Sequence, residues 1–223
     1  MPYRKTKLVT NEIYHVVARG VAQAPIFKDK RDNARILETI NFYKHPHPPI
    51  RFSHYNRLAT FDKELILEKL NNQKPIVEII SFSLMPNHLH FLLKQTQEHG
   101  ISIFMKNLQD SYARYFNTKY KRIGALFQSM FKAVRIENDE QLLHVSRYIH
   151  LNPVTSFLIE IDELDKYPWN SFGEYMEKRP KTFVNSSLIL SFFNSKEEYR
   201  RFVFDQVDYQ RKLNQIKHLL LEG

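Results

Sequence analysis

Two histidines, His88 and His90, stand two residues apart and are separated by Leu89. The apolar segment 88–93 is expected to form a strand, in which alternate side chains point to the same face. Both imidazoles would then face one direction, while Leu89 points into the core. Neutral imidazole suits divalent first-row metals, and added oxygen ligands draw Mg²⁺ or Mn²⁺. The pair therefore suits a metal site, although the same spacing also fits a polar pair on a strand surface.

A second group lies further along the chain, at Tyr148 and Asn152. The two residues are four apart in a segment expected to be helical, so they share a helix face. A tyrosine hydroxyl can attack a phosphodiester, and a metal ion can relieve charge at the scissile phosphate. The Asn152 oxygen would complete the metal shell, and His144, one turn before Tyr148, would line the pocket. The alternative is that Tyr148 packs in the core and Asn152 caps the helix end.

The elements that must position these residues can be predicted from local patterns. An apolar strand over 76–84 and the strand over 88–93 form a hairpin-like pair. The helix over 139–151 begins after Asn138, a good N-cap, and Gln141 three residues later fits a capping box. Pro153 is expected to end this helix, because the residue before a proline avoids helical geometry.

The remaining pattern predicts an α+β fold. Strands are expected over 11–18 and 126–136, and helices over 28–43, 62–71, 101–119, 186–193 and 195–221. Residues 44–75, which begin with a proline-rich break, are typical of an insertion between core elements. The order of strands and helices favours an antiparallel sheet with helices packed on it. On the helix over 101–119, Tyr112 and Tyr115 fall on the apolar face and are expected in the core.

Composition and charge limit the class of protein. The chain has 223 residues, of which 43% are hydrophobic, so it can bury a core. It has no cysteine, which excludes thiol catalysis and cysteine-ligated metal. No signal peptide or membrane span is evident, so we expect a soluble, cytoplasmic protein. The net charge of +9 favours a nucleic-acid partner, with nucleoid association as the expected location.

Basic residues gather around the segment that links the two candidate groups. They would contact the DNA backbone, or they are ordinary solvated charge. The residues are Arg114, Lys119, Lys121, Arg122, Lys132 and Arg135.

Longer motifs around these residues resemble the REP-associated tyrosine transposases. These belong to the single-tyrosine HUH transposase superfamily, which is insertion-sequence transposase-like and is named for its His-hydrophobe-His pair. The resemblance rests mainly on the segments 85–90, Met-Pro-Asn-His-Leu-His, and 147–154, Arg-Tyr-Ile-His-Leu-Asn-Pro-Val. Segments 111–117, 124–128 and 167–172, together with the N-terminal 14–16, 19–20 and 26–27, also fit. The order and spacing of these segments extend the likeness over residues 10–175.

The resemblance implies a fold and a mechanism. The fold would be a ferredoxin-like antiparallel sheet of the HUH endonuclease type, with a C-terminal helical extension. His88 and His90 would bind Mg²⁺ or Mn²⁺, and Asn152 would take the place of the third ligand, which is often Gln in related enzymes. Tyr148 would form a 5′-phosphotyrosine link and free a 3′-hydroxyl before rejoining. The substrate would be single-stranded DNA beside a REP-like hairpin.

Several alternatives remain open at this point. The catalytic domain would span 1–175, with the insertion at about 44–75, and the extension would span 176–223. A monomer is favoured over a dimer. Two other functions fit the sequence: a hairpin-DNA-binding protein without catalysis, and a metal-dependent phosphoesterase that uses water.

Overall fold

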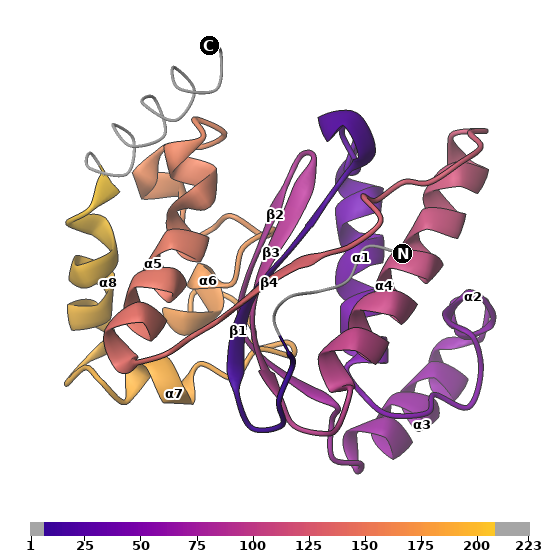
Figure 1. Ribbon diagram of the computed structural model, residues 1–223, viewed down its shortest axis with the longest axis horizontal. Helices are drawn as coiled ribbons and strands as arrows, with labels where there is room; N and C mark the ends of the chain where they lie inside the picture. Colours follow the sequence, from indigo (N-terminus) through magenta and orange to yellow (C-terminus); the bar gives the residue numbers. More distant parts are fainter. Residues whose placement is uncertain (1–6, 208–223) are drawn as a thin grey trace. The chain divides into compact units, whose positions relative to one another are not determined.

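The computed structural model describes residues 7–207, which form a four-stranded sheet with helices (Figure 1). The strands are β1 (Ile13–Arg19), β2 (Val77–Met85), β3 (His88–Gln95) and β4 (Lys132–Arg135). They lie in the order β2-β3-β1-β4. With α1 (Lys30–Tyr43) after β1 and α4 (Gly100–Lys119) after β3, the chain follows the β-α-β-β-α-β order of ferredoxin-like folds. The predicted α+β fold is therefore confirmed.

The chain divides into two compact units. Among the described residues, the first unit comprises 7–78, 86–88 and 93–135, and the second comprises 79–85, 89–92 and 136–207. Strands β2 and β3 therefore contribute residues to both units. The predicted domain boundary at 175/176 stays a prediction, and the part of the predicted helix beyond residue 207 lies outside the described residues.

In the first unit, β1 pairs with β4 in antiparallel register, from Tyr14 opposite Arg135 to Val17 opposite Lys132. Strand β1 alternates between buried and partly buried residues, as expected for a strand with one face in the core. Strand β4 is shorter than the predicted strand over 126–136. Before it, Phe127 forms only an isolated bridge with Gly20.

Helices α1 and α4 pack against each other in the first unit, and the insertion follows α1 (Figure 1). The insertion forms α2 (Phe52–Tyr55) and α3 (Thr60–Asn71), close to the predicted helix over 62–71. Its small core contains Phe42, Phe52, Tyr55 and Leu70. The insertion thus folds on the end of α1 through its own aromatic cluster.

A buried carboxylate ties α1 to α4. Asp32 is fully buried, and its oxygens accept hydrogen bonds from the hydroxyls of Tyr115 and Tyr120. The carboxylate also forms an ion pair with Lys119 at 2.7 Å. Burial opposes the charged form of Asp32, but these donors outweigh it and lower the pKa of the carboxyl. Loss of one donor from such a network is costly, because it leaves a buried charge incompletely paired.

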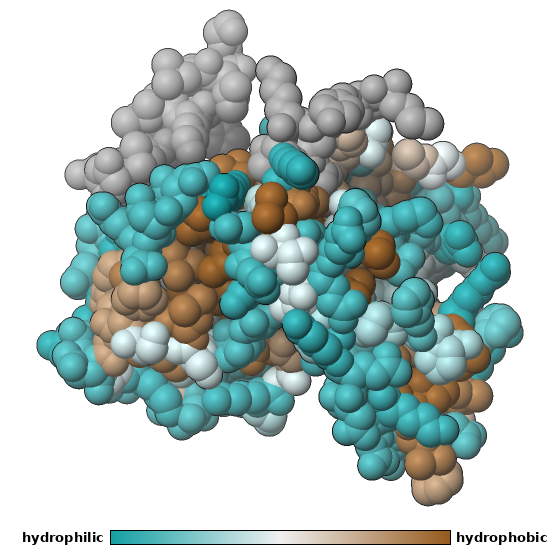
Figure 2. Space-filling view, turned by 60° about the horizontal axis from the view of Figure 1, so that its bottom comes forward, coloured by the Kyte–Doolittle hydropathy of each residue, from teal (hydrophilic) through white to brown (hydrophobic). Residues whose placement is uncertain are grey.

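The second unit contains α5 (Asp139–Thr155), α6 (Phe172–Tyr175), α7 (Ser187–Leu190) and α8 (Lys196–Phe204), and α5 contacts α7 and α8. Short 3₁₀ turns occur at Val21–Gln23 in the first unit and Ile161–Glu163 in the second. On the face shown in Figure 2, hydrophilic residues predominate and apolar residues form separate patches. Within residues 7–207, no helix combines the length and apolar character needed to cross a membrane.

Candidate active site

His88 and His90 lie on β3, at the first and third residues of the strand. Alternate strand residues share a face, so the two imidazoles leave the strand on the same side. His90 is only 4% exposed, whereas His88 is partly buried. Burial and the nearby charge of Arg19 lower the pKa of His88 to about 4, so its imidazole is neutral at pH 7. A neutral imidazole is the form that binds a metal ion.

Tyr148 packs against His90 within the second unit. The centroids of the two rings are 5.7 Å apart and the ring planes meet at 81°, so one ring presents its edge to the other. Tyr148 lies on α5 and is partly exposed. A tyrosine that contacts a buried histidine and also reaches solvent can meet a substrate, which a tyrosine packed in the core cannot do.

Helix α5 begins after Asn138, as the sequence predicts, but the predicted capping box does not form. The Asn138 side chain accepts a hydrogen bond from the Gln141 backbone N–H at 2.9 Å, whereas the Gln141 side chain accepts one from the N–H of Glu137 and not from that of Asn138. Asp139 and Glu140 lie in the first turn, where their negative charge interacts favourably with the positive end of the helix dipole. This cap fixes the start of the helix, two and a half turns before Tyr148.

The predicted end of this helix is wrong: α5 continues through Pro153 to Thr155. A proline has no N–H, so the carbonyl of Ile149, four residues earlier, loses its helical partner. The Asn170 side chain replaces that partner, because its Nδ2 donates to the carbonyls of Ile149 at 3.2 Å and His150 at 3.0 Å. A loop residue distant in sequence thus makes the proline acceptable.

Because the helix continues, Asn152 lies within α5 and not at its end. Its side chain is 4% exposed and follows Tyr148 by one turn on the same face. Among the described residues, its Nδ2 has no hydrogen-bond partner. The unpaired atom is an N–H donor, so it can bond an oxygen of another group, whereas the amide oxygen is the atom that a metal ion would bind.

The opposite side of α5 carries a buried polar network. His150 is fully buried, and burial lowers its pKa to about 3. Its ring nitrogens lie 2.8 Å from the hydroxyl of Tyr199 and 2.8 Å from that of Ser171. Ser171 also bonds the backbone of Phe82 on β2. The network therefore holds α5 against α8 and β2, and so fixes the helix that carries Tyr148.

The remaining predicted pocket residue, His144, has a different environment. It is exposed, its Nδ1 lies 2.6 Å from an Arg147 guanidinium nitrogen, and its ring packs near Phe202 of α8. Arg147 stacks over Phe202 at 4.2 Å and donates to its carbonyl. These contacts connect His144 with α8.

The predicted DNA-binding residues do not form one group. Arg114 and Lys119 lie on α4 and line the same hollow. Arg122 bonds Asn117 and the Ala125 carbonyl, and Arg135 pairs with Glu12 at 2.8 Å. Lys121 and Lys132 are exposed.

Sequence reasoning did not find the roles of Asn170 and Ser171. Both are fully buried, and they directly follow Pro168 and Trp169. The only signal was their place in the 167–172 motif. Within residues 7–207, no cluster of three His, Cys, Asp or Glu residues is suited to a metal ion.

Comparisons with known proteins agree with this fold. Residues 53–152 match the model of the family described as IS200-like transposases. This match confirms the resemblance to insertion-sequence transposases that the sequence motifs indicated.

Among solved structures, the fold resembles that of a REP-associated tyrosine transposase bound to a REP hairpin. The TM-score is 0.55 at 12% identity, over 84% of this chain and 96% of that one. A candidate transposase from Deinococcus radiodurans gives a TM-score of 0.37 at 15% identity, over 66% of this chain and 95% of that one. No curated protein sequence matches.

Proposed function

We propose that this protein cuts and rejoins single-stranded DNA through a covalent link to Tyr148. The observation that carries the proposal is the edge-on contact of Tyr148 with His90 at 5.7 Å in the second unit. It brings a partly exposed nucleophile to one of the two imidazoles of the metal pair. The IS200-like family match and the transposase fold support this chemistry.

The reaction is a transesterification. The Tyr148 oxygen attacks a backbone phosphorus, a tyrosyl–phosphorus bond forms, and the bond from phosphorus to the 3′-oxygen breaks. The tyrosine proton passes to solvent, and the departing 3′-oxygen takes up a proton. The 5′-phosphotyrosine keeps the energy of the broken bond, so a 3′-hydroxyl can attack it later and rejoin the strand without a nucleotide cofactor.

The donor set fits a divalent metal ion. His88 is neutral at pH 7, His90 shares its strand face, and the buried Asn152 lies one turn after Tyr148 on α5. We propose that these three residues hold Mg²⁺ or Mn²⁺. When bound, the ion would stabilise negative charge on the scissile phosphate.

The proposed substrate is single-stranded DNA beside a hairpin. The solved relative is a REP-associated transposase bound to a REP hairpin, and this chain carries a net charge of +9. We propose that the protein acts as a monomer.

The test is an adduct assay on labelled single-stranded DNA that carries a hairpin from the flanks of the gene. With Mg²⁺ or Mn²⁺, the wild type should form a covalent protein–DNA species that survives denaturing electrophoresis. Tyr148→Phe should form none, and Tyr167→Phe, at a partly buried tyrosine outside the Asp32 network, serves as a control. Cleavage without an adduct would point to a phosphoesterase that uses water, and hairpin binding without cleavage would point to an inactive DNA-binding protein. An adduct in Tyr148→Phe would refute the assignment.

A further inference from the structure

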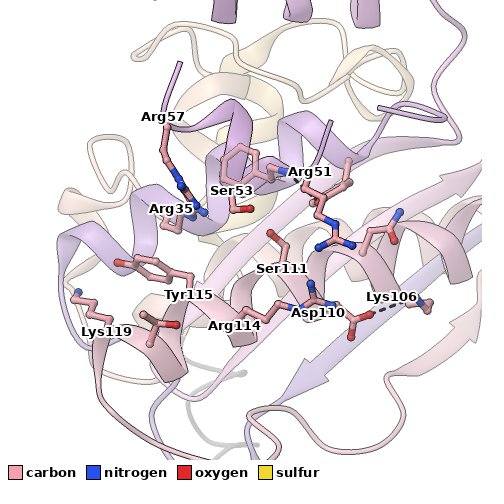
Figure 3. Close-up of a pocket in the computed structure, with 14 residues that line it drawn as sticks. Arg35, Arg51, Ser53, Arg57, Lys106, Asp110, Ser111, Arg114, Tyr115 and Lys119 are labelled. Carbon is pink, nitrogen blue, oxygen red and sulfur yellow. Dashed lines mark hydrogen bonds and ion pairs between the residues drawn. The ribbon is translucent and has the colours of Figure 1, made fainter. Parts of the chain in front are cut away.

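A hollow of about 550 Å³ lies within the first unit (Figure 3). None of the residues proposed to cut DNA lines it. Residues of α1 and of the segment 51–57 line it together with one face of α4. On α4, the lining residues form two rows at helical spacing, one that includes Lys106, Asp110 and Arg114 and one that includes Ser111, Tyr115 and Lys119. The regular spacing shows that a whole helix face borders this hollow.

The insertion positions the other side. Phe52 is buried in the aromatic cluster with Phe42 of α1, at 5.2 Å between ring centroids. This contact fixes the segment that carries Arg51, Ser53 and Arg57 beside the hollow. The basic residues of the insertion therefore come from a packed element.

The charge of the lining is strongly positive. Asp110 is its only acidic residue, and it pairs with Lys106 at 3.3 Å. The basic residues of the lining are Arg35, Arg51, Arg57, Lys106, Arg114 and Lys119.

Among the described residues, four of these basic side chains have no ion pair. Lys119 pairs with Asp29 and Asp32, and Lys106 pairs with Asp110. In contrast, within residues 7–207 no ion pair or side-chain hydrogen bond is formed by the guanidinium groups of Arg35, Arg51, Arg57 and Arg114. Uncompensated guanidinium groups around one hollow attract an anion with several oxygens, because each guanidinium can bind two oxygens in parallel.

Arg35 is held in a fixed orientation between aromatic rings. Its guanidinium lies 4.3 Å from the centroid of Phe52 and 5.2 Å from that of Tyr115. Among the described residues, its buried Nε has no hydrogen-bond partner. Stacking leaves the N–H edge of a guanidinium available and reduces the entropy lost when it binds a phosphate.

A second hollow of about 450 Å³ shares Arg35, Ser53, Arg57 and Tyr115 with the first. Arg31 and one acidic residue, Glu38, also line it, so three arginines there face one carboxylate. Together the two hollows form one groove along α1, α2 and α4, called here the α1–α2–α4 groove. A single inorganic phosphate would fill only a small part of it, whereas a chain of phosphates would follow it.

We propose that the α1–α2–α4 groove binds the sugar–phosphate backbone of the DNA substrate, separately from the residues that cut it. The inference rests on the proposed function, which identifies the bound polyanion as DNA. Arginines would bind the phosphate of either a DNA strand or a free nucleotide, so the free nucleotide is the alternative ligand that the experiment must distinguish.

The test measures binding of a fluorescent single-stranded oligonucleotide over a range of salt concentrations. Arg57→Glu with Arg114→Glu should weaken binding at least about tenfold and flatten the plot of log affinity against log salt. For two lost phosphate contacts the slope should change by about 1.4, since each contributes about 0.7 on single strands. The control is Lys69→Glu with Lys74→Glu, which makes the same charge change at exposed residues outside the groove. This control pair should retain most of the affinity and slope.

The outcomes separate this inference from the proposed function. If the wild type forms the Tyr148 adduct but both double variants bind alike, the groove inference is wrong and the proposed function stands. If the groove variants alone lose binding while no adduct forms, the groove stands and the proposed chemistry fails. Competition by dAMP that is as strong as that of the oligonucleotide per molecule would overturn the DNA assignment in favour of a free nucleotide. Inorganic phosphate should compete only weakly.

Discussion

The Tyr148 region of the second unit and the α1–α2–α4 groove of the first unit are held by different forces. Tyr148 lies on a helix fixed by neutral, buried hydrogen bonds around His150 and Asn170. The groove borders a charged network in which Lys119 pairs with Asp29 and Asp32. Strand cleavage needs one rigidly placed nucleophile, whereas binding of the DNA backbone needs several cations at the surface. Variants in the first region should change reactivity, and variants in the second should change affinity.

The largest expected effect is on His90. His90→Ala should lower metal-dependent strand cleavage by at least about 100-fold, because even outer-shell partners of metal ligands contribute 10- to 100-fold. Oligonucleotide binding should change little, which would sharpen the division between the two regions. His99→Ala is the control, since His99 is well exposed. Cleavage at wild-type rates in a folded His90→Ala protein would contradict the claim that the Tyr148 region controls reactivity.

Asn170 should dominate the stability of the Tyr148 region. Asn170→Ala leaves the Ile149 carbonyl without its donor and removes buried bonds to His150 and Ser83. The expected loss is about 3 kcal/mol of unfolding free energy in urea, because a buried unsatisfied group costs about 1–3 kcal/mol.

A double-mutant cycle isolates the cause. Pro153→Ala restores an N–H four residues after Ile149, so Asn170→Ala should cost about 1 kcal/mol less in that background. Equal losses in both backgrounds would show that Asn170 does not replace the missing proline donor.

Asn152 should have a smaller effect, on metal affinity. Asn152→Ala should raise the Mn²⁺ concentration for half-maximal cleavage about tenfold, whereas Asn152→Asp keeps an oxygen ligand and should stay near the wild type. Direct Mn²⁺ binding measured by electron paramagnetic resonance should follow the same order. An unchanged Mn²⁺ midpoint in Asn152→Ala would exclude it as the third ligand.

The last effect is absent at pH 7 and concerns the buried His150. Its folded-state pKa of about 3 lies below the ordinary value of 6.5, so the unfolded chain binds the proton first as the pH falls. Unfolding free energy should therefore decrease from about pH 6.5 toward about pH 3, by at most about 1.4 kcal/mol per pH unit for this group. His150→Gln should show a shallower slope in urea unfolding at each pH. An identical slope would mean that other histidines account for the whole effect.

Local signals in the sequence predicted much of the fold. The Asn138 cap, the strand pair around His88 and His90, and the helical face shared by Tyr148 and Asn152 all depend on residues close in sequence. The end of α5 could not be predicted in this way, because the donor that tolerates Pro153 is Asn170, which follows in a loop.

Local sequence patterns also could not predict the α1–α2–α4 groove. Tyr115 was expected in the core because it lies on the apolar face of α4, and Tyr112 is indeed fully buried there. Tyr115 instead lines the groove, since the insertion brings Arg51 and Arg57 beside α4. Only tertiary packing brings these arginines together.

The central claim, that Tyr148 is the nucleophile, can be tested by locating the adduct on the chain. The wild type is incubated with single-stranded hairpin DNA and Mn²⁺, treated with nuclease and trypsin, and analysed by mass spectrometry. Cleavage after Arg147 and Lys166 gives the peptide 148–166, whose only tyrosine is Tyr148. The account predicts a nucleotide mass on this peptide. A nucleotide on a peptide with another tyrosine, beside an unmodified 148–166 peptide, would contradict it.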